Sequence, residues 1–200
     1  MLTIDLYGRF SSAFGFVAAN IRTRTQPHGT PSGVEVYVAD ATFADLKLKS
    51  AKDGKVYEFR NTILNATDKT TFVPDKKFFA PPPILKFDRS KKITATAIAG
   101  SDNVVVEDFG LEQWEITMDG LLIDMDAHKY PTAKVQRFRQ LFETPDVFDV
   151  LECQVMTDLG INALYFTKVD NLAVLENYPD TVKYTLKAKS IQPPEFTISD

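Results

Sequence analysis

Strict alternation of apolar and polar residues in short segments constrains the fold of this chain more than any other feature. Residues 181–189 show it most clearly. Their apolar set is Val182, Tyr184, Leu186 and Ala188. Successive side chains of a β-strand point to opposite faces, so this pattern predicts a strand with one buried face. The outward set comprises Thr181, Lys183, Thr185, Lys187 and Lys189, which form either a solvated face or a row that meets a partner.

Residues 93–123 carry the same pattern over a longer stretch. Ile93–Ala97 alternates, Gly100 to Asn103 turns the chain, and a second strand begins at Val104 and ends near Gly110. A third strand, led by Trp114, closes at Gly120 and continues through residues 121–123 after a bulge at that glycine. Short strands joined by tight turns predict an antiparallel meander.

Other segments complete the expected fold. Residues 34–40 alternate, and Asp53-Gly54 predicts a hairpin whose return strand is 56–64. Residues 65–85 form a Pro-rich excursion, in which Pro81–Pro83 is either a stiff connector or a ligand for an aromatic groove. Residues 131–143 predict a helix that begins after Pro131. We expect an α+β fold, mainly antiparallel β, with one packed helix. Its parts are an N-terminal arm, hairpin and excursion (1–82) and a β domain (83–200).

An aromatic-rich stripe near the N-terminus predicts a helix with three alternative roles. The stripe comprises Leu6, Phe10, Phe14, Val17 and Ile21. The helix is expected to pack in the core, to dock on a neighbouring subunit, or to lie on a membrane surface. The last role favours a face rich in lysine and arginine, which this segment lacks.

The composition offers few groups for catalysis. A formal net charge of −4 argues against a dedicated nucleic-acid binder, and no apolar segment approaches the roughly 20 residues of a membrane span. No signal peptide is visible. The single cysteine, Cys153, is expected to be a buried, inert thiol. Asp124, Asp126 and His128 supply too few ligands for a cation site. We therefore expect no catalytic, cofactor-binding or metal-binding residues, and no enzymatic activity.

The segment from Pro83 to Phe196 resembles an uncharacterised family of phage tail proteins associated with the baseplate and its hub. It is also similar in layout to tail-tube-adjacent proteins of contractile injection systems. The resemblance lies in a strand closed by glycine, a W-x-I-x-x-x-G strand, a helix opened by Tyr-Pro, and a Leu-Gly-Ile turn. The matching positions are Gly100, Trp114, Ile116, Gly120, Tyr130, Pro131, Leu141, Leu159, Gly160 and Ile161.

The resemblance implies a structural subunit without a cofactor, in the baseplate, hub or tube-initiating layer. It implies a sandwich or barrel-like sheet of the tail-tube type and a ring, hexameric or trimeric, that also contacts other tail tube, hub or baseplate proteins. The subunit would be made in the cytoplasm and reside in a virion tail or injection particle. It would not recognise nucleic acid directly or insert stably into a membrane. The candidate assembly residues are Phe10, Phe14, Phe16, Gly100, Trp114, Gly120, Tyr130, Pro131 and Gly160. The alternative is a β module that binds carbohydrate or a host surface.

Overall fold

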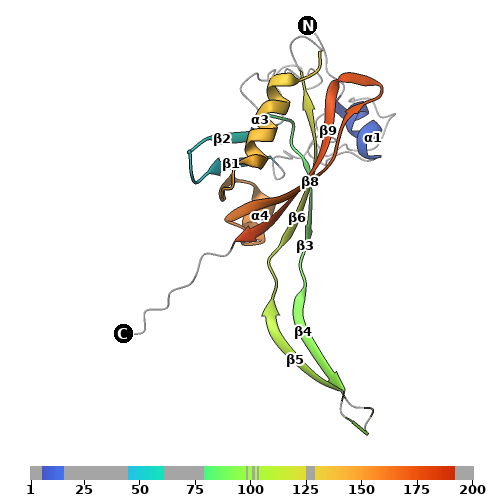
Figure 1. Ribbon diagram of the computed structural model, residues 1–200, viewed down its shortest axis with the longest axis vertical. Coiled ribbons are helices and arrows are strands. Elements are labelled where there is room, and N and C mark those ends of the chain that lie inside the picture. Colours follow the sequence, from blue (N-terminus) through green and yellow to red (C-terminus); the bar gives the residue numbers. More distant parts are fainter. Residues whose placement is uncertain are drawn as a thin grey trace, which may run out of the picture.

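A seven-stranded antiparallel sheet organises the molecule (Figure 1). The computed structural model describes residues 6–15, 45–60, 79–97, 99–100, 102, 104–124 and 129–191. The strand order is β2-β1-β7-β8-β9-β6-β3. The strands are β1 (Leu46–Ser50), β2 (Val56–Phe59), β3 (Ile84–Asp88), β6 (Glu115–Ile123), β7 (Phe148–Glu152), β8 (Ala163–Leu175) and β9 (Tyr178–Ile191). Within the described ranges the end strands β2 and β3 do not pair with each other, so the sheet is open rather than closed into a barrel.

Among the described residues, two further strands form a separate hairpin, and three helices accompany the sheets. The hairpin consists of β4 (Lys91–Ala97) and β5 (Val104–Leu111). The helices are α1 (Leu6–Phe14), α3 (Thr132–Glu143) and α4 (Gln154–Asp158). The expected α+β class with mainly antiparallel strands is confirmed, as is the helix predicted after Pro131. The short helix α4, in a segment that sequence patterning treated as extended, was missed.

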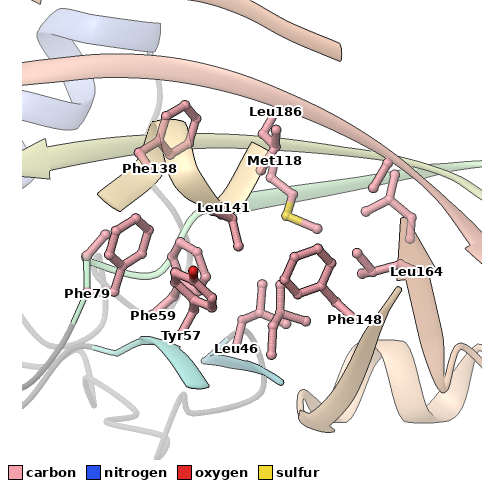
Figure 2. Close-up of a cluster of buried hydrophobic side chains, with 14 of the residues drawn as sticks. Leu46, Tyr57, Phe59, Phe79, Met118, Phe138, Leu141, Phe148, Leu164 and Leu186 are labelled. Carbon is pink, nitrogen blue, oxygen red and sulfur yellow. The ribbon is translucent and has the colours of Figure 1, made fainter. Parts of the chain in front are cut away.

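The main core lies on the face of the sheet that carries α3 (Figure 2). Alternation along β9 points Val182, Tyr184, Leu186 and Ala188 into this core, as predicted. The ring of Phe138 from α3 packs on Tyr184, with 4.6 Å between ring centroids. The hairpin of β1 and β2 supplies further aromatic and aliphatic residues to the same core, among them Leu46, Tyr57 and Phe59.

The opposite face of the sheet is covered at one end by α1. Phe10 is fully buried there, and Leu121 and Ile123 point to this face because they alternate with the core residue Leu122. The Arg9 guanidinium donates to both carboxylate oxygens of Asp180 and to the hydroxyl of Thr181. This segment therefore packs on the chain's own sheet, and Thr181, predicted to face solvent, is buried beneath Arg9.

Two further expectations about strands are corrected. β6 pairs with β9 continuously through Gly120, so there is no bulge at this glycine. The strands predicted at 93–97 and near 104–110 exist, but they pair only with each other and lie outside the main sheet. The return strand of the first hairpin is confirmed for Val56–Phe59. The strand predicted at 34–40, residues 61–64, His28 and Phe16 lie outside the described residues.

Candidate interaction surface

The β4–β5 hairpin projects from the end of the main sheet and is the most conspicuous surface feature of the molecule (Figure 1). β3 leads into β4 through Arg89 and Ser90, and β5 leads back into β6. The hairpin therefore prolongs the outer strand pair β3–β6 away from the core. Every residue of β4 and β5 is exposed. An isolated two-stranded sheet is only marginally stable in water, so this length of exposed hairpin needs an explanation.

Local contacts brace the base of the hairpin. Arg89 Nε donates to the carbonyl oxygen of Glu112 at 2.8 Å, and the Glu112 amide donates to the Ser90 carbonyl at 2.9 Å. The Arg89 guanidinium also lies over the Trp114 ring, 5.1 Å from its centroid. Ser190 of β9 and Trp114 exchange two hydrogen bonds, from the Trp114 amide to Ser190 Oγ and from the Ser190 amide to the Trp114 carbonyl. The direction in which the hairpin leaves the sheet is thus held by the sheet itself.

A bulge near this base bends the hairpin. The register shifts between Lys91 and Ile93, so that β5 has an extra residue there. Gly110 adopts a φ of 93°, in the left-handed region that glycine tolerates, and its amide donates to Asp108 Oδ1 at 2.9 Å.

One face of the hairpin is apolar. Residues directly opposite each other in the ladder share a face, and the pairs Ala95–Val106 and Ala97–Val104 do so. We call the face that carries Ile93, Ala95, Ala97, Val104 and Val106 the valine face; its one carboxylate, Asp108, lies near the base directly opposite Ile93. Ile93 and Val104 are each 53% exposed and Val106 is 63% exposed. The reverse face, which we call the threonine face, carries Thr94, Thr96, Val105 and Glu107.

The uncovered part of the large sheet is polar, and its charges neutralise one another. Asp119 accepts from Lys86 Nζ at 2.7 Å and from Thr185 Oγ1 at 2.6 Å. Asp170 lies 2.8 Å from Lys168 Nζ and 3.8 Å from Lys187 Nζ. The hydrogen bond from Lys168 holds the pKa of Asp170 below its usual value. All of these groups except Lys168 line an open hollow of about 430 Å³. A carboxylate held ionised by lysines is a poor general base near neutral pH.

The structure separates the nine candidate residues rather than bringing them into one site. Phe10 of α1 is buried, Phe14 of the same helix is half-buried, and Phe16 lies outside the described residues. Gly100 lies at the tip of the hairpin with a φ of 80°, and Trp114 lies half-buried at its base. The remaining four are Gly120 in the core beside Tyr184, exposed Tyr130, buried Pro131, and Gly160 in the turn after α4.

Of the candidate metal ligands, the structure describes Asp124 alone, and it also describes the single thiol. Among the described residues, no group of three or more histidine, cysteine, aspartate or glutamate side chains could hold a metal ion. Asp124 accepts from the Lys129 amide, while Asp126 and His128 lie outside the described residues. Cys153 is buried, as predicted, and burial raises its pKa. Pro81–Pro83 is buried within its own chain. Within the described ranges, no helix is long and apolar enough to span a bilayer.

Comparisons with known proteins assign the chain to a family but not to an activity. Residues 78–200 match the family model described as "Domain of unknown function (DUF6046)". No curated protein matches the sequence. One solved structure with a similar chain is "Tail of empty GTA particle computed with helical refinement, C6 symmetry". That chain is 14% identical, and the alignment covers 80% of this chain and 98% of the other with a TM-score of 0.39. A TM-score this low assigns neither a fold nor a role.

Proposed function

The chain belongs to the DUF6046 family of domains of unknown function, and on that premise we propose that it is a structural subunit of a phage-like tail. The observation that carries the proposal is the projecting hairpin with its exposed valine face. An apolar surface on an exposed sheet is an aggregation hazard unless a partner covers it. A subunit that is buried in an assembly resolves this hazard.

The two edges of the sheet differ, and this difference also supports a role in assembly. On the β2 side, Phe59 pairs with Ala80 in a parallel bridge, and backbone bonds join Arg60 to Ala80 and Phe79 to Glu58. The chain therefore blocks this edge with its own segment. On the other side, β3 and β4 form a long outer edge on which the described residues provide no further strand. A sheet with one blocked and one open edge is suited to ordered addition of a neighbour.

The resemblance of residues 83–196 to tail and baseplate proteins supplies the finer part of the proposal. We place the subunit in the baseplate, hub or tube-initiating layer, as a ring that contacts other tail proteins and resides in the particle. Its role is structural rather than catalytic. The mutual pairing of Asp119 and Asp170 with lysines agrees with that role, because it leaves these carboxylates neutralised.

The alternative, a carbohydrate- or host-surface-binding module, would need an exposed aromatic platform. Trp114 is the one tryptophan of the chain. One face of its ring is taken by Arg89, and its amide and carbonyl are engaged by Ser190. No described contact of Trp114 favours sugar binding.

The proposal is tested by measuring the mass of the full chain in solution by light scattering across concentration, followed by electron microscopy of any large species. We expect closed rings or stacked rings whose share rises with concentration. A chain that stays monomeric up to its solubility limit would contradict self-assembly. A matched sample in which the hairpin is excised separates assembly through the hairpin from assembly through other surfaces.

A further inference from the structure

The valine face lacks a cover in the described structure, and its shape and charge indicate what covers it. We propose that it packs face to face against the valine face of a second copy of this chain, with the two hairpins side by side and their tips at the same end. The contact is a two-fold pair whose axis runs along the hairpins. It extends the proposed function by naming the partner of the hairpin, and it depends on neither ring size nor place in a tail.

The first argument is the relief of this face. The two alanines, Ala95 and Ala97, lie on β4, while the valines directly opposite them, Val106 and Val104, lie on β5. The face therefore has a low trough at Ala95 and Ala97 of β4, which Ile93 ends toward the base, and a ridge at Val104 and Val106 of β5. Packed sheets lie about 10 Å apart, and they pack most densely when large residues of one sheet face small residues of the other.

A two-fold axis parallel to the strands matches these two columns. Such an axis exchanges left and right, so it places each β4 over the β5 of the other copy. The Val104–Val106 ridge of each chain then enters the alanine trough of the other. A self-complementary surface of this kind is what an isologous contact requires. An axis perpendicular to the strands would instead set ridge on ridge.

The second argument is charge. Near the base of the valine face, β4 carries Lys91 and β5 carries Asp108, whereas Lys92 and Glu107 alternate to the reverse face. Lys91 Nζ and Asp108 already lie 3.7 Å apart within one chain, and both are largely exposed. The same axis that seats the ridges places the basic base of each β4 opposite the acidic base of the partner's β5. Opposite charges facing each other fix the register and disfavour other pairings.

The reverse face is a poorer partner surface. It presents two threonine hydroxyls and the Glu107 carboxylate around a single valine, Val105. Asp108 on the valine face lies 3.7 Å from Lys91 Nζ, whereas Glu107 has no ion-pair partner among the described residues, so covering the reverse face would bury an uncompensated carboxylate. The contact is therefore assigned to the valine face alone, and this difference between the faces supplies the control for the experiment.

The decisive variant is Ala95→Leu, which fills the trough while making the surface more apolar. If two copies pair as proposed, the dissociation constant measured by sedimentation of the full chain rises about tenfold or more, because overpacking a fitted contact is costly. Thr96→Leu adds the same side chain to the threonine face and leaves the constant within about twofold. Non-specific hydrophobic association predicts the reverse, since Ala95→Leu would then strengthen it.

A charge exchange tests the orientation. Asp108→Lys places like charges together at the base of the pair and weakens self-association. Adding Lys91→Glu to the same chain restores opposite charges across the contact and restores association. Circular dichroism melting of each variant confirms the fold, which these exposed positions leave intact. A double variant that associates no better than Asp108→Lys alone would overturn the arrangement.

The outcomes separate this inference from the tail proposal. A wild-type chain without self-association overturns both. Rings that persist in Ala95→Leu leave the tail proposal standing and overturn the hairpin pair. Wild-type dimers that form no larger species, and become monomers in Ala95→Leu, establish the hairpin pair and contradict the ring. Equal weakening by Ala95→Leu and Thr96→Leu also overturns the assignment to the valine face.

Discussion

Gly120 shows at the scale of one residue why a glycine stands among the inward-facing residues of β6. A Cβ at this position would lie 2.3 Å from the Tyr184 hydroxyl oxygen and 2.4 Å from ring carbon Cζ. The Tyr184 ring is fully buried and packs against Phe138, so the core leaves it little room to move away. Gly120 is therefore a packing requirement of the core rather than the end of a strand.

We expect Gly120→Ala to lower the free energy of unfolding by about 2–3 kcal/mol, because overpacking forces the ring from its site. Urea denaturation followed by tryptophan fluorescence measures the loss. In a Tyr184→Leu background, where the ring is absent, the same substitution should cost far less. An equal cost in both backgrounds would show that the ring is not the cause.

A substitution of Tyr184 itself is expected to have the opposite effect and to increase stability. Its hydroxyl is buried without a hydrogen-bond partner among the described residues, and burial strongly raises its pKa. Tyr184→Phe removes a polar group that gains nothing in the folded state, and should stabilise the protein by about 1 kcal/mol. Thermal melting checks the sign. A loss of stability would mean that the hydroxyl is satisfied, for example by ordered water.

Helix α1 is the element whose role sequence patterning left open. Arg9 and Asp180 are almost fully buried, with side-chain exposures of 7% and 6%, and Thr181 completes the contact. The guanidinium also lies 4.6 Å from the Tyr178 ring centroid. Without α1, Asp180 and the apolar side chains beside this helix would lose their cover.

Asp180→Asn is expected to lower the free energy of unfolding by about 3–5 kcal/mol, since it leaves the Arg9 charge buried and uncompensated. Chemical denaturation measures it. Glu115→Gln breaks an ion pair of the same kind with Lys189, but at an exposed site. That control should cost less than about 1 kcal/mol. Similar losses of unfolding free energy in the two variants would show that burial does not increase the cost of breaking the Arg9–Asp180 pair.

The hairpin is the second element whose contribution can be isolated. Asp88 and Glu115 are directly opposite each other in the β3–β6 ladder, so a short glycine-containing turn can replace the residues between Arg89 and Gln113. We expect this excision to leave the free energy of unfolding within about 0.5 kcal/mol, because all of β4 and β5 is exposed. Self-association should disappear. A large loss of stability would instead make the hairpin part of the fold.

A local sequence pattern predicts which residues of a strand share a face, but it does not predict which other segment packs on that face. Alternation predicted the inward residues of β9 correctly, because one neighbouring layer covers that whole face. It misplaced Thr181, whose cover is a residue 172 positions away. It also placed residues 93–111 within the main sheet. Alternation reports that a strand has an apolar face, and it does not report whether the same chain or another one covers that face.

At the scale of the whole molecule, the sheet joins segments that sequence analysis assigned to different parts. The boundary predicted at residues 82 and 83 remains a prediction, but β1 pairs with β7 and the β1–β2 hairpin shares the core with α3. A single core predicts one cooperative transition. Fluorescence of Trp114 and far-ultraviolet circular dichroism should therefore report the same denaturation midpoint. Separate midpoints would instead support two independently folding parts.

The distance along the chain between bonded partners also has a consequence during protein synthesis. Ser50 bonds to Asp146 across 96 positions and Arg9 bonds to Asp180 across 171. Neither contact can form until the later residue of the pair has been synthesised and has emerged from the ribosome. Contacts between residues so distant in sequence also slow folding. The hairpin, whose strands are close in sequence, can form earlier, while the sheet is still incomplete. The nascent chain therefore presents its valine face before its core exists, and polysomes that hold many copies bring such faces together first.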